Sequence, residues 1–155
     1  MLSHFYLFFP GKETVLMLGG WDGGKMVDSL LILQDNGEYG NWKELSIKLP
    51  HAAKSHGAQF LNNYLYIFGG LNEKNETFNS AYQLSIRYKW YTLSNGFQWD
   101  KMADMNEKRT HISNSSVILN DRIWVLGGFN GKEVVKSVEM YDPQTNIWTN
   151  MKWVI

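Results

Sequence analysis

Short apolar runs separated by polar turns follow one another along the chain. Three of these runs end in a pair of glycines, at residues 15–20, 65–70 and 123–128. The glycine pairs are spaced 50 and 58 residues apart. Self-similarity with a period of roughly 20–50 residues is typical of solenoids, propellers or arrays, so the repeat unit decides the fold.

Each repeat is predicted to contain four antiparallel strands. Two-residue turns, Asn62-Asn63 and Asn120-Asp121, join two of the glycine-pair runs to the apolar runs before them, which is the pattern of a β-hairpin. A third run follows each glycine pair, and in residues 137–141 it alternates with the period of a strand. The fourth short run carries a lone tryptophan: Trp42, Trp99 and Trp148.

These strands predict a single all-β domain over residues 1–155, with approximate repeats at 13–45, 56–102 and 111–151. Residues 101–109 have a helix-forming composition, but no helical period longer than two turns is present, which favours a polar loop. The apolar residues 1–9 lack a basic segment and a small-residue cleavage site, which favours a strand over a signal peptide.

The third repeat carries a longer signature. Gly127-Gly128 is followed by Tyr141-Asp142-Pro143 and then by the segment 145–148, Thr-Asn-Ile-Trp. This arrangement resembles the kelch repeat. The first two repeats match it less fully, because Leu33-Gln34 and Leu84-Ser85 stand where Tyr141-Asp142 stand in the third. The second repeat also has an insertion around residues 87–92.

The resemblance covers residues 13–151 and implies a partial kelch β-propeller of three four-stranded antiparallel blades. In such blades the glycine pair allows close backbone approach or a positive φ, and the tryptophans pack between neighbouring blades. Propellers have about four to eight blades. The three repeats resemble the start of a kelch domain, so we expect a fragment of a six-bladed propeller or a half that self-associates through its open blades.

Composition narrows the function classes. Lys plus Arg equals Asp plus Glu at 15 each, and a chain without net charge is a poor binder of nucleic acid. The absence of cysteine excludes disulfides, a cysteine nucleophile and a cysteine-ligated zinc site. The sequence has no apolar run long enough for a transmembrane helix, so no membrane partner is predicted and a cytoplasmic location is expected.

A glycine-rich motif and the histidines could indicate a nucleotide-binding loop and a metal site, but both have simpler interpretations. Residues 19–25 fit G-x-x-x-x-G-K, yet Met26 follows where a nucleotide-binding loop needs Ser or Thr, which favours a turn between strands. The four histidines show no metal-binding spacing: His4, His51, His56 and His111. Galactose oxidase is an enzyme with kelch-like blades, but its crosslinked cysteine has no counterpart here. No catalytic, cofactor or metal site is therefore predicted, and an enzyme with a site on the propeller face is the less favoured class.

The resemblance places a binding surface on the loops that join the second and third strands of each blade and those that link the blades. These loops include residues 21–25, 71–75, 129–132, 51–55 and 107–111. Their aromatic residues are candidate anchors and their polar residues are candidate hydrogen-bonding groups. The candidate partner-binding residues are Trp21, Asp22, Lys54, His56, Asn72, Arg109, His111, Phe129 and Asn130.

The function implied by the resemblance is a non-catalytic module that binds a protein or a linear peptide motif. Kelch-like proteins often carry such a domain after BTB and BACK domains and recruit substrates to a Cullin-3 ubiquitin ligase. Other kelch proteins bind actin or act as scaffolds. Both roles are open at this stage, and cosedimentation with filaments would separate the actin role from the adaptor role.

Overall fold

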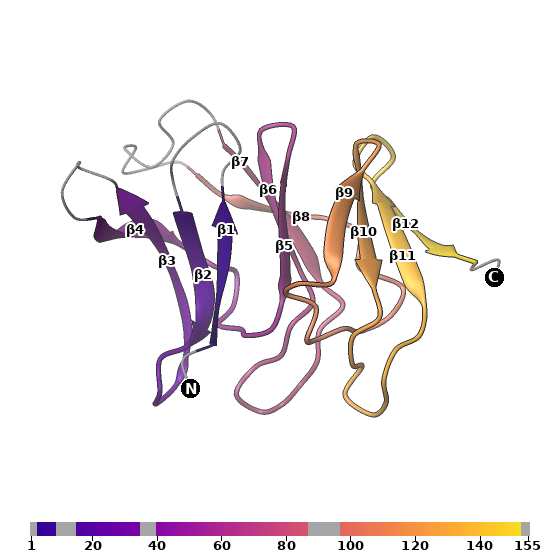
Figure 1. Cartoon of the computed structure of the whole chain (residues 1–155), viewed down its shortest axis with the longest axis horizontal. Helices are drawn as coiled ribbons and strands as arrows, with labels where there is room; N and C mark the ends of the chain where they lie inside the picture. The colour runs from indigo at the N-terminus through magenta and orange to yellow at the C-terminus, as the bar shows by residue number, and fades with distance from the viewer. Residues whose placement is uncertain (1–2, 9–14, 35–39, 87–96, 153–155) are drawn as a thin grey trace.

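The described residues form three antiparallel four-stranded sheets. The computed structural model describes residues 3–8, 15–34, 40–86 and 97–152, and every regular element in these ranges is a strand. Within each sheet the strands lie in chain order and are paired antiparallel (Figure 1). The all-β prediction and the four-stranded blades are confirmed.

The strands of the first sheet are β1 (Ser3–Phe8), β2 (Val15–Trp21), β3 (Met26–Gln34) and β4 (Asn41–Lys48). Those of the second are β5 (Gly57–Leu61), β6 (Tyr64–Phe68), β7 (Ala81–Ser85) and β8 (Trp99–Lys101). Those of the third are β9 (Ser116–Leu119), β10 (Arg122–Leu126), β11 (Val138–Asp142) and β12 (Ile147–Met151). We call these sheets blades 1, 2 and 3.

The predicted hairpins are present. Asn62 and Asn63 have φ angles of 50° and 64°, and Asn120 and Asp121 have φ angles of 52° and 56°. Two consecutive residues with positive φ make the type I′ turn that matches the twist of antiparallel strands, and Asn and Asp tolerate this conformation best among non-glycine residues. Residues 102–109 form a loop, as predicted.

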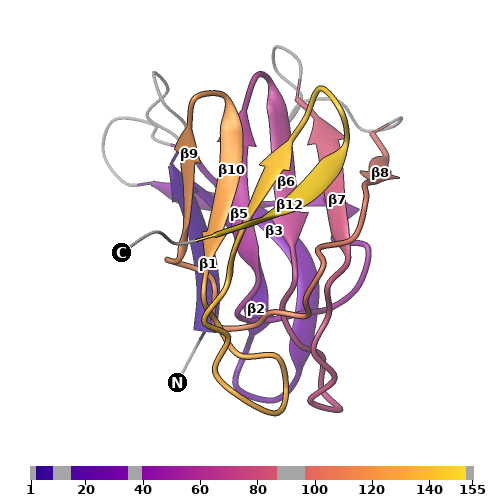
Figure 2. The ribbon, with the colours of Figure 1, turned by 90° about the vertical axis from the view of Figure 1, so that its right-hand side faces the viewer.

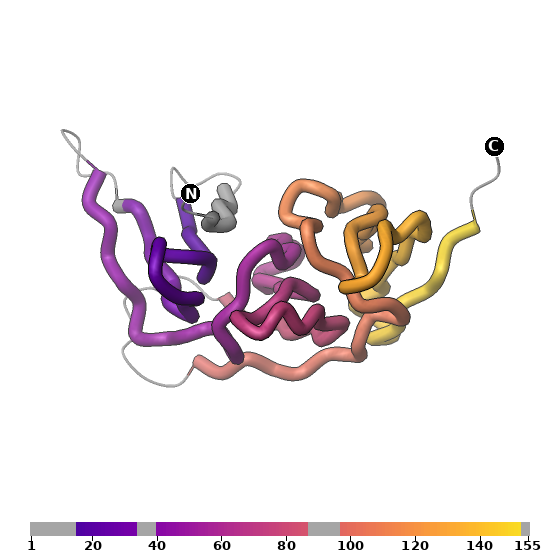
Figure 3. The backbone as a smooth tube through the Cα atoms, turned by 90° about the horizontal axis from the view of Figure 1, so that it is seen from below, coloured from indigo at the N-terminus to yellow at the C-terminus, as the bar shows by residue number. Residues whose placement is uncertain are grey.

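The first strands of neighbouring blades contact one another, β1 with β5 and β5 with β9. The blades therefore fan out from a common edge in chain order, and they form an arc when seen from below (Figure 3). Figure 2 looks along this row from blade 3 toward blade 1. This is the arrangement of consecutive blades in a propeller.

The apolar core consists of two layers, one between each pair of blades. In β6, Leu65 and Ile67 belong to the layer against blade 1, whereas Tyr66 and Phe68 belong to the layer against blade 3. A strand that is covered on both faces needs apolar residues at successive positions, which explains the continuous runs before the glycine pairs.

Three features differ from the prediction or lie outside it. The first sheet begins with β1 at Ser3, earlier than the predicted repeat start at residue 13. Trp148 is 5% exposed between blades 2 and 3, but Trp42 on the outer face of blade 1 is 42% exposed, because no described residue forms a blade on that side. The insertion around residues 87–92 and Pro10-Gly11 lie outside the described residues.

Candidate partner-binding face

The glycine pairs contact the loops that link neighbouring blades. The amide of Gly20 donates to the carbonyl of Ala53 at 2.9 Å, and the amide of Gly70 donates to the carbonyl of Arg109 at 2.8 Å. A Cβ atom on Gly69 would lie 2.3 Å from the Arg109 carbonyl oxygen. No side chain fits in that space, so the loop that links two blades packs directly on the glycine backbone, as the sequence predicted.

The loops between the second and third strands and those between blades gather at the same end of the molecule (lower edge in Figure 1). We call this surface the loop face. It comprises residues 21–25, 71–77 and 129–134 together with the inter-blade residues 51–55 and 107–111. Bridges join the two kinds of loop, Lys54 with Leu71 and Thr110 with Phe129, so the backbone of the loop face is tied into the blades.

Three of the candidate residues shape the turns of the loop face. The Oδ1 atom of Asp22 accepts from the amides of Gly24 and Lys25, both at 2.8 Å. Asn72 and Asn130 cap the equivalent turns of blades 2 and 3 in the same way. The two backbone donors hold the pKa of Asp22 below its usual value. These side chains determine the loop conformation, and Asp22 remains exposed to solvent.

The aromatic candidates occupy equivalent positions directly after a glycine pair. Trp21 is half-buried, and the ammonium group of Lys54 lies 5.5 Å from the centre of its ring, within the range of a cation–π contact. Phe129 is also half-buried and meets the ring of His111 edge to face, with 6.4 Å between the ring centroids. The loop face therefore carries two part-exposed aromatic rings, each beside a basic side chain: Trp21 of blade 1 with Lys54, and Phe129 of blade 3 with His111.

Arg109 does not take part in this surface. It is 0% exposed and forms a buried ion pair with Glu139, whose Oε1 accepts from Nε and Nη2 at 3.1 and 3.0 Å. Its Nη1 donates to the carbonyls of Gly127 and Ser137 at 2.7 and 3.0 Å. All of its donors are engaged inside blade 3, so Arg109 cannot bind a partner in this arrangement. It joins the inter-blade loop to the sheet.

His56 is also buried, with 2% of its surface exposed. Burial and, to a lesser extent, the nearby His51 lower the pKa of His56 to about 4. A neutral, enclosed imidazole is unsuited to binding acidic groups on the surface. The exposed or half-buried candidates that remain on the loop face are Trp21, Asp22, Lys54, Asn72, His111, Phe129 and Asn130.

Sequence reasoning missed Glu139. Its Oε2 also accepts from the amide and side chain of Asn106 at 2.6 and 2.8 Å, so it organises the whole loop before blade 3. The available signal was a carboxylate inside an otherwise apolar strand, since a charged residue at a covered sheet position is rarely left without a partner.

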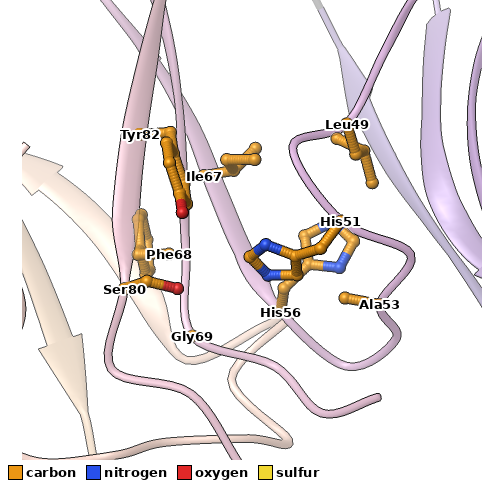
Figure 4. A pocket seen from close by; sticks show the side chains of 9 residues that line it. All are labelled: Leu49, His51, Ala53, His56, Ile67, Phe68, Gly69, Ser80 and Tyr82. Carbon is orange, nitrogen blue, oxygen red and sulfur yellow. The ribbon is translucent and has the colours of Figure 1, made fainter. Parts of the chain in front are cut away.

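Blade 2 has a hollow where blade 3 has this ion pair. Ala53 occupies the position equivalent to Arg109, because the carbonyl of each accepts from the amide of the second glycine of the preceding blade. Tyr82 occupies the position equivalent to Glu139, because the two residues have the same register in the third strand. The hollow occupies about 240 Å³ including its opening to solvent and is lined by residues from β6, β7 and the inter-blade loop (Figure 4). Ser80 Oγ is buried there without a hydrogen-bond partner among the described residues, whereas Ser137 Oγ accepts from Arg109.

The described residues contain neither a cluster of metal-ligating side chains nor a membrane-spanning helix. In residues 3–8, 15–34, 40–86 and 97–152, no group of three or more His, Cys, Asp or Glu side chains is arranged to hold a metal ion. The same part of the chain contains no helix of the length and hydropathy needed to cross a bilayer.

Comparison with known proteins places the chain in a family. The model of the KLHDC2/KLHL20/DRC7 Kelch-repeats domain matches residues 7–154. Spermatocyte protein spe-26 of Caenorhabditis elegans is 32% identical over 144 residues, which cover 89% of this chain and 23% of that protein. Kelch-like protein 36 of Mus musculus is 32% identical over 131 residues, covering 82% and 20%. Beta-scruin of Limulus polyphemus is 28% identical over 148 residues, covering 89% and 15%.

The chain thus spans less than a quarter of the length of each of these relatives. The family match extends over almost the whole chain and agrees with the three antiparallel blades, the glycine pairs between them and the Tyr-Asp-Pro turn of blade 3. The chain belongs to the kelch-repeat family.

Proposed function

We propose that the chain is a non-catalytic protein-interaction module whose loop face binds a protein or a linear peptide. The observation that carries this proposal is the pair of part-exposed aromatic rings, Trp21 and Phe129, on loops that are fixed by hydrogen bonds to the blades. Large rings on a rigid backbone provide contact area with little loss of conformational entropy, and such residues dominate binding energy at protein interfaces.

The charges around these rings indicate the chemistry of the ligand. Lys54 and His111 lie beside the two rings. Of the acidic groups on the same loops, Glu73 accepts from the amide of Met26 and Glu107 accepts from Asn130 and Ser137, whereas Asp22 and Glu133 are exposed. A peptide with apolar side chains for the rings and one acidic group for Lys54 fits this surface best.

The test uses a peptide library displayed against the purified chain, followed by titration of the selected peptides. We expect Trp21→Ala and Phe129→Ala each to weaken binding by about 30-fold, since loss of a hot-spot ring costs about 2 kcal/mol. Asp121→Gly, in the hairpin at the opposite end of blade 3, is the matched control and should bind normally. Selected peptides that bind all three variants equally would contradict the loop-face assignment.

Within this function we propose a substrate-recognition role in a Cullin-3 ubiquitin ligase adaptor located in the cytoplasm, supported by the similarity to Kelch-like protein 36. An actin-binding scaffold is the second candidate that the family resemblance supports. The two differ in a direct measurement. A recognition module binds short peptides and stays in the supernatant when filaments are sedimented, whereas an actin-binding module sediments with filaments and loses this property with the loop-face variants.

A further inference from the structure

The hollow in blade 2 corresponds to a space that an arginine side chain fills in blade 3. Arg109 enters that space from the loop before blade 3, and its equivalent before blade 2 is Ala53, whose side chain ends at Cβ. Ala53 is itself buried, so the loop backbone keeps its place while the long side chain is missing. The lining of the hollow includes Leu49 and Ile67, which belong to the apolar layer between blades 1 and 2. Residues of both neighbouring blades therefore enclose it.

Blade 2 retains the acceptors that hold the guanidinium group in blade 3. There, Nη1 of Arg109 donates to the carbonyls of Gly127 and Ser137, and Nη2 donates to Ser137 Oγ at 2.6 Å. Gly69 and Ser80 are the equivalent residues, because the glycine amide donates to the serine carbonyl at 3.0 Å in blade 2 and at 3.1 Å in blade 3. Ser80 Oγ is buried without a hydrogen-bond partner among the described residues, and Figure 4 shows it directed into the hollow, toward the histidine rings. A buried hydroxyl without a partner costs free energy, which favours a polar occupant.

The charge of the hollow differs from that of the arginine site. Tyr82 occupies the position of Glu139, the carboxylate that balances Arg109, and none of the described residues that line the hollow is acidic. The ammonium of Lys101 lies 5.0 Å from the centre of the Tyr82 ring. Burial and, to a lesser extent, Lys101 hold the pKa of His51 below its usual value, so this imidazole is neutral at pH 7. A buried cation would lack a counter-charge here, and an anion would face backbone carbonyl oxygens, so a neutral group that both donates and accepts fits best.

The dimensions of the hollow select the tip of a side chain. The hollow opens to solvent, and its enclosed part has room for about one water-sized group. The NH2 group of a primary carboxamide has this size and two hydrogens for the carbonyls of Gly69 and Ser80, and the carboxamide oxygen can accept from Ser80 Oγ. Ala53 in the lining directly precedes Lys54, which lies against Trp21. One wall of the hollow is therefore continuous with the loop face.

We propose that the hollow is a subsite for a glutamine side chain of the peptide that binds the loop face. The carboxamide takes the place, in blade 2, of the guanidinium group that Arg109 supplies in blade 3. This subsite rests on the proposed function, and it adds one uncharged polar residue to the apolar and acidic residues expected of the peptide.

Calorimetric titration of a peptide selected on the wild-type chain tests the subsite. Ser80→Ala should weaken binding of the glutamine peptide about fivefold, as expected for loss of one hydrogen bond, and should not change binding of the same peptide with alanine in place of glutamine. Thr145→Ala removes an exposed hydroxyl from the hairpin between β11 and β12, at the opposite end of the blades, and is the matched control that should bind both peptides normally. Ala53→Arg combined with Tyr82→Glu rebuilds the blade 3 ion pair in the hollow and should remove the preference for glutamine.

The outcomes separate the subsite from the loop-face function. If binding depends on Trp21 but Ser80→Ala affects the glutamine and alanine peptides equally, the subsite is wrong and the loop-face function stands. Selected peptides without a glutamine at a fixed position would overturn the subsite in the same way. If no peptide binds, or if Trp21→Ala binds as the wild type does, the proposed function fails and the subsite fails with it. Should the double variant not fold, the Ser80→Ala comparison decides alone, because it removes a single oxygen atom.

Discussion

Arg109 shows how much a single buried ion pair contributes to joining two segments of the chain. Its guanidinium is enclosed with Glu139 and two backbone carbonyls, so removing the negative partner leaves an uncompensated charge. We expect Glu139→Gln to destabilise the protein by about 3–5 kcal/mol in urea unfolding. Replacing both Arg109 and Glu139 with methionine should cost less than the single change, because no charge is then left buried. Glu133→Gln, on an exposed loop, should have almost no effect.

His56 makes stability depend on pH. Its pKa is about 4 in the folded protein and 6.5 in the unfolded chain, so between these values the unfolded chain binds more protons. Stability should therefore rise between about pH 4 and pH 6.5 by about 3 kcal/mol and become flat above this range. His51, whose pKa burial also lowers, adds to the same trend.

Urea unfolding of His56→Ile over this pH range measures the contribution of His56. Isoleucine is the matched choice, because Ile112 occupies the equivalent buried position before blade 3 and follows a residue of the same positive φ: 56° at Ser55 and 59° at His111. The slope of the variant should fall to the smaller part that His51 contributes. A slope equal to that of the wild type would assign the pH dependence to other groups.

At the scale of the elements, the first glycine of a pair ends the second strand of its blade, and at Gly69 the loop that leads to the next blade packs on it. Gly69 and Gly127 both have a φ of 65°, but a Cβ would lie 2.3 Å from the Arg109 carbonyl at Gly69 and 3.3 Å from the nearest atom at Gly127. The two positions thus share backbone strain and differ in the inter-blade contact. We expect Gly127→Ala to cost about 1–2 kcal/mol and Gly69→Ala about 1–3 kcal/mol more.

Thermal or urea unfolding of the two alanine variants under the same conditions gives this difference directly. It isolates the contact between a glycine and the following loop from the cost of the left-handed conformation. Equal losses at Gly69 and Gly127 would mean that the loop before blade 3 moves aside without cost, and that the glycine pair is required by its φ alone.

The strands and hairpins could be predicted because their determinants are local. The Asn62-Asn63 and Asn120-Asp121 turns fix the hairpins, and the apolar runs reflect cover on both faces. The burial of Arg109 and His56 could not be predicted, because burial depends on residues distant in sequence. In the sequence, Arg109 looks like a surface residue in a polar loop. Its burial depends on the ion pair with Glu139, which lies 30 residues later. Trp21 and Phe129 remain candidates, and their place directly after a recognisable glycine pair is what put them on the loop face in the prediction.

At the scale of the whole molecule, the loop face draws residues from all three blades, and two shared apolar layers join those blades. A peptide bound on the loop face should therefore stabilise the whole folded chain by mass action. At a peptide concentration of about 100 times its Kd, the free energy of unfolding should rise by about 2.7 kcal/mol, which raises Tm by roughly 5–11 °C for a chain of this size. The same peptide concentration should raise the Tm of Trp21→Ala less and that of Asp121→Gly equally. An equal rise in Tm for Trp21→Ala and the wild type would mean that the peptide binds away from the loop face.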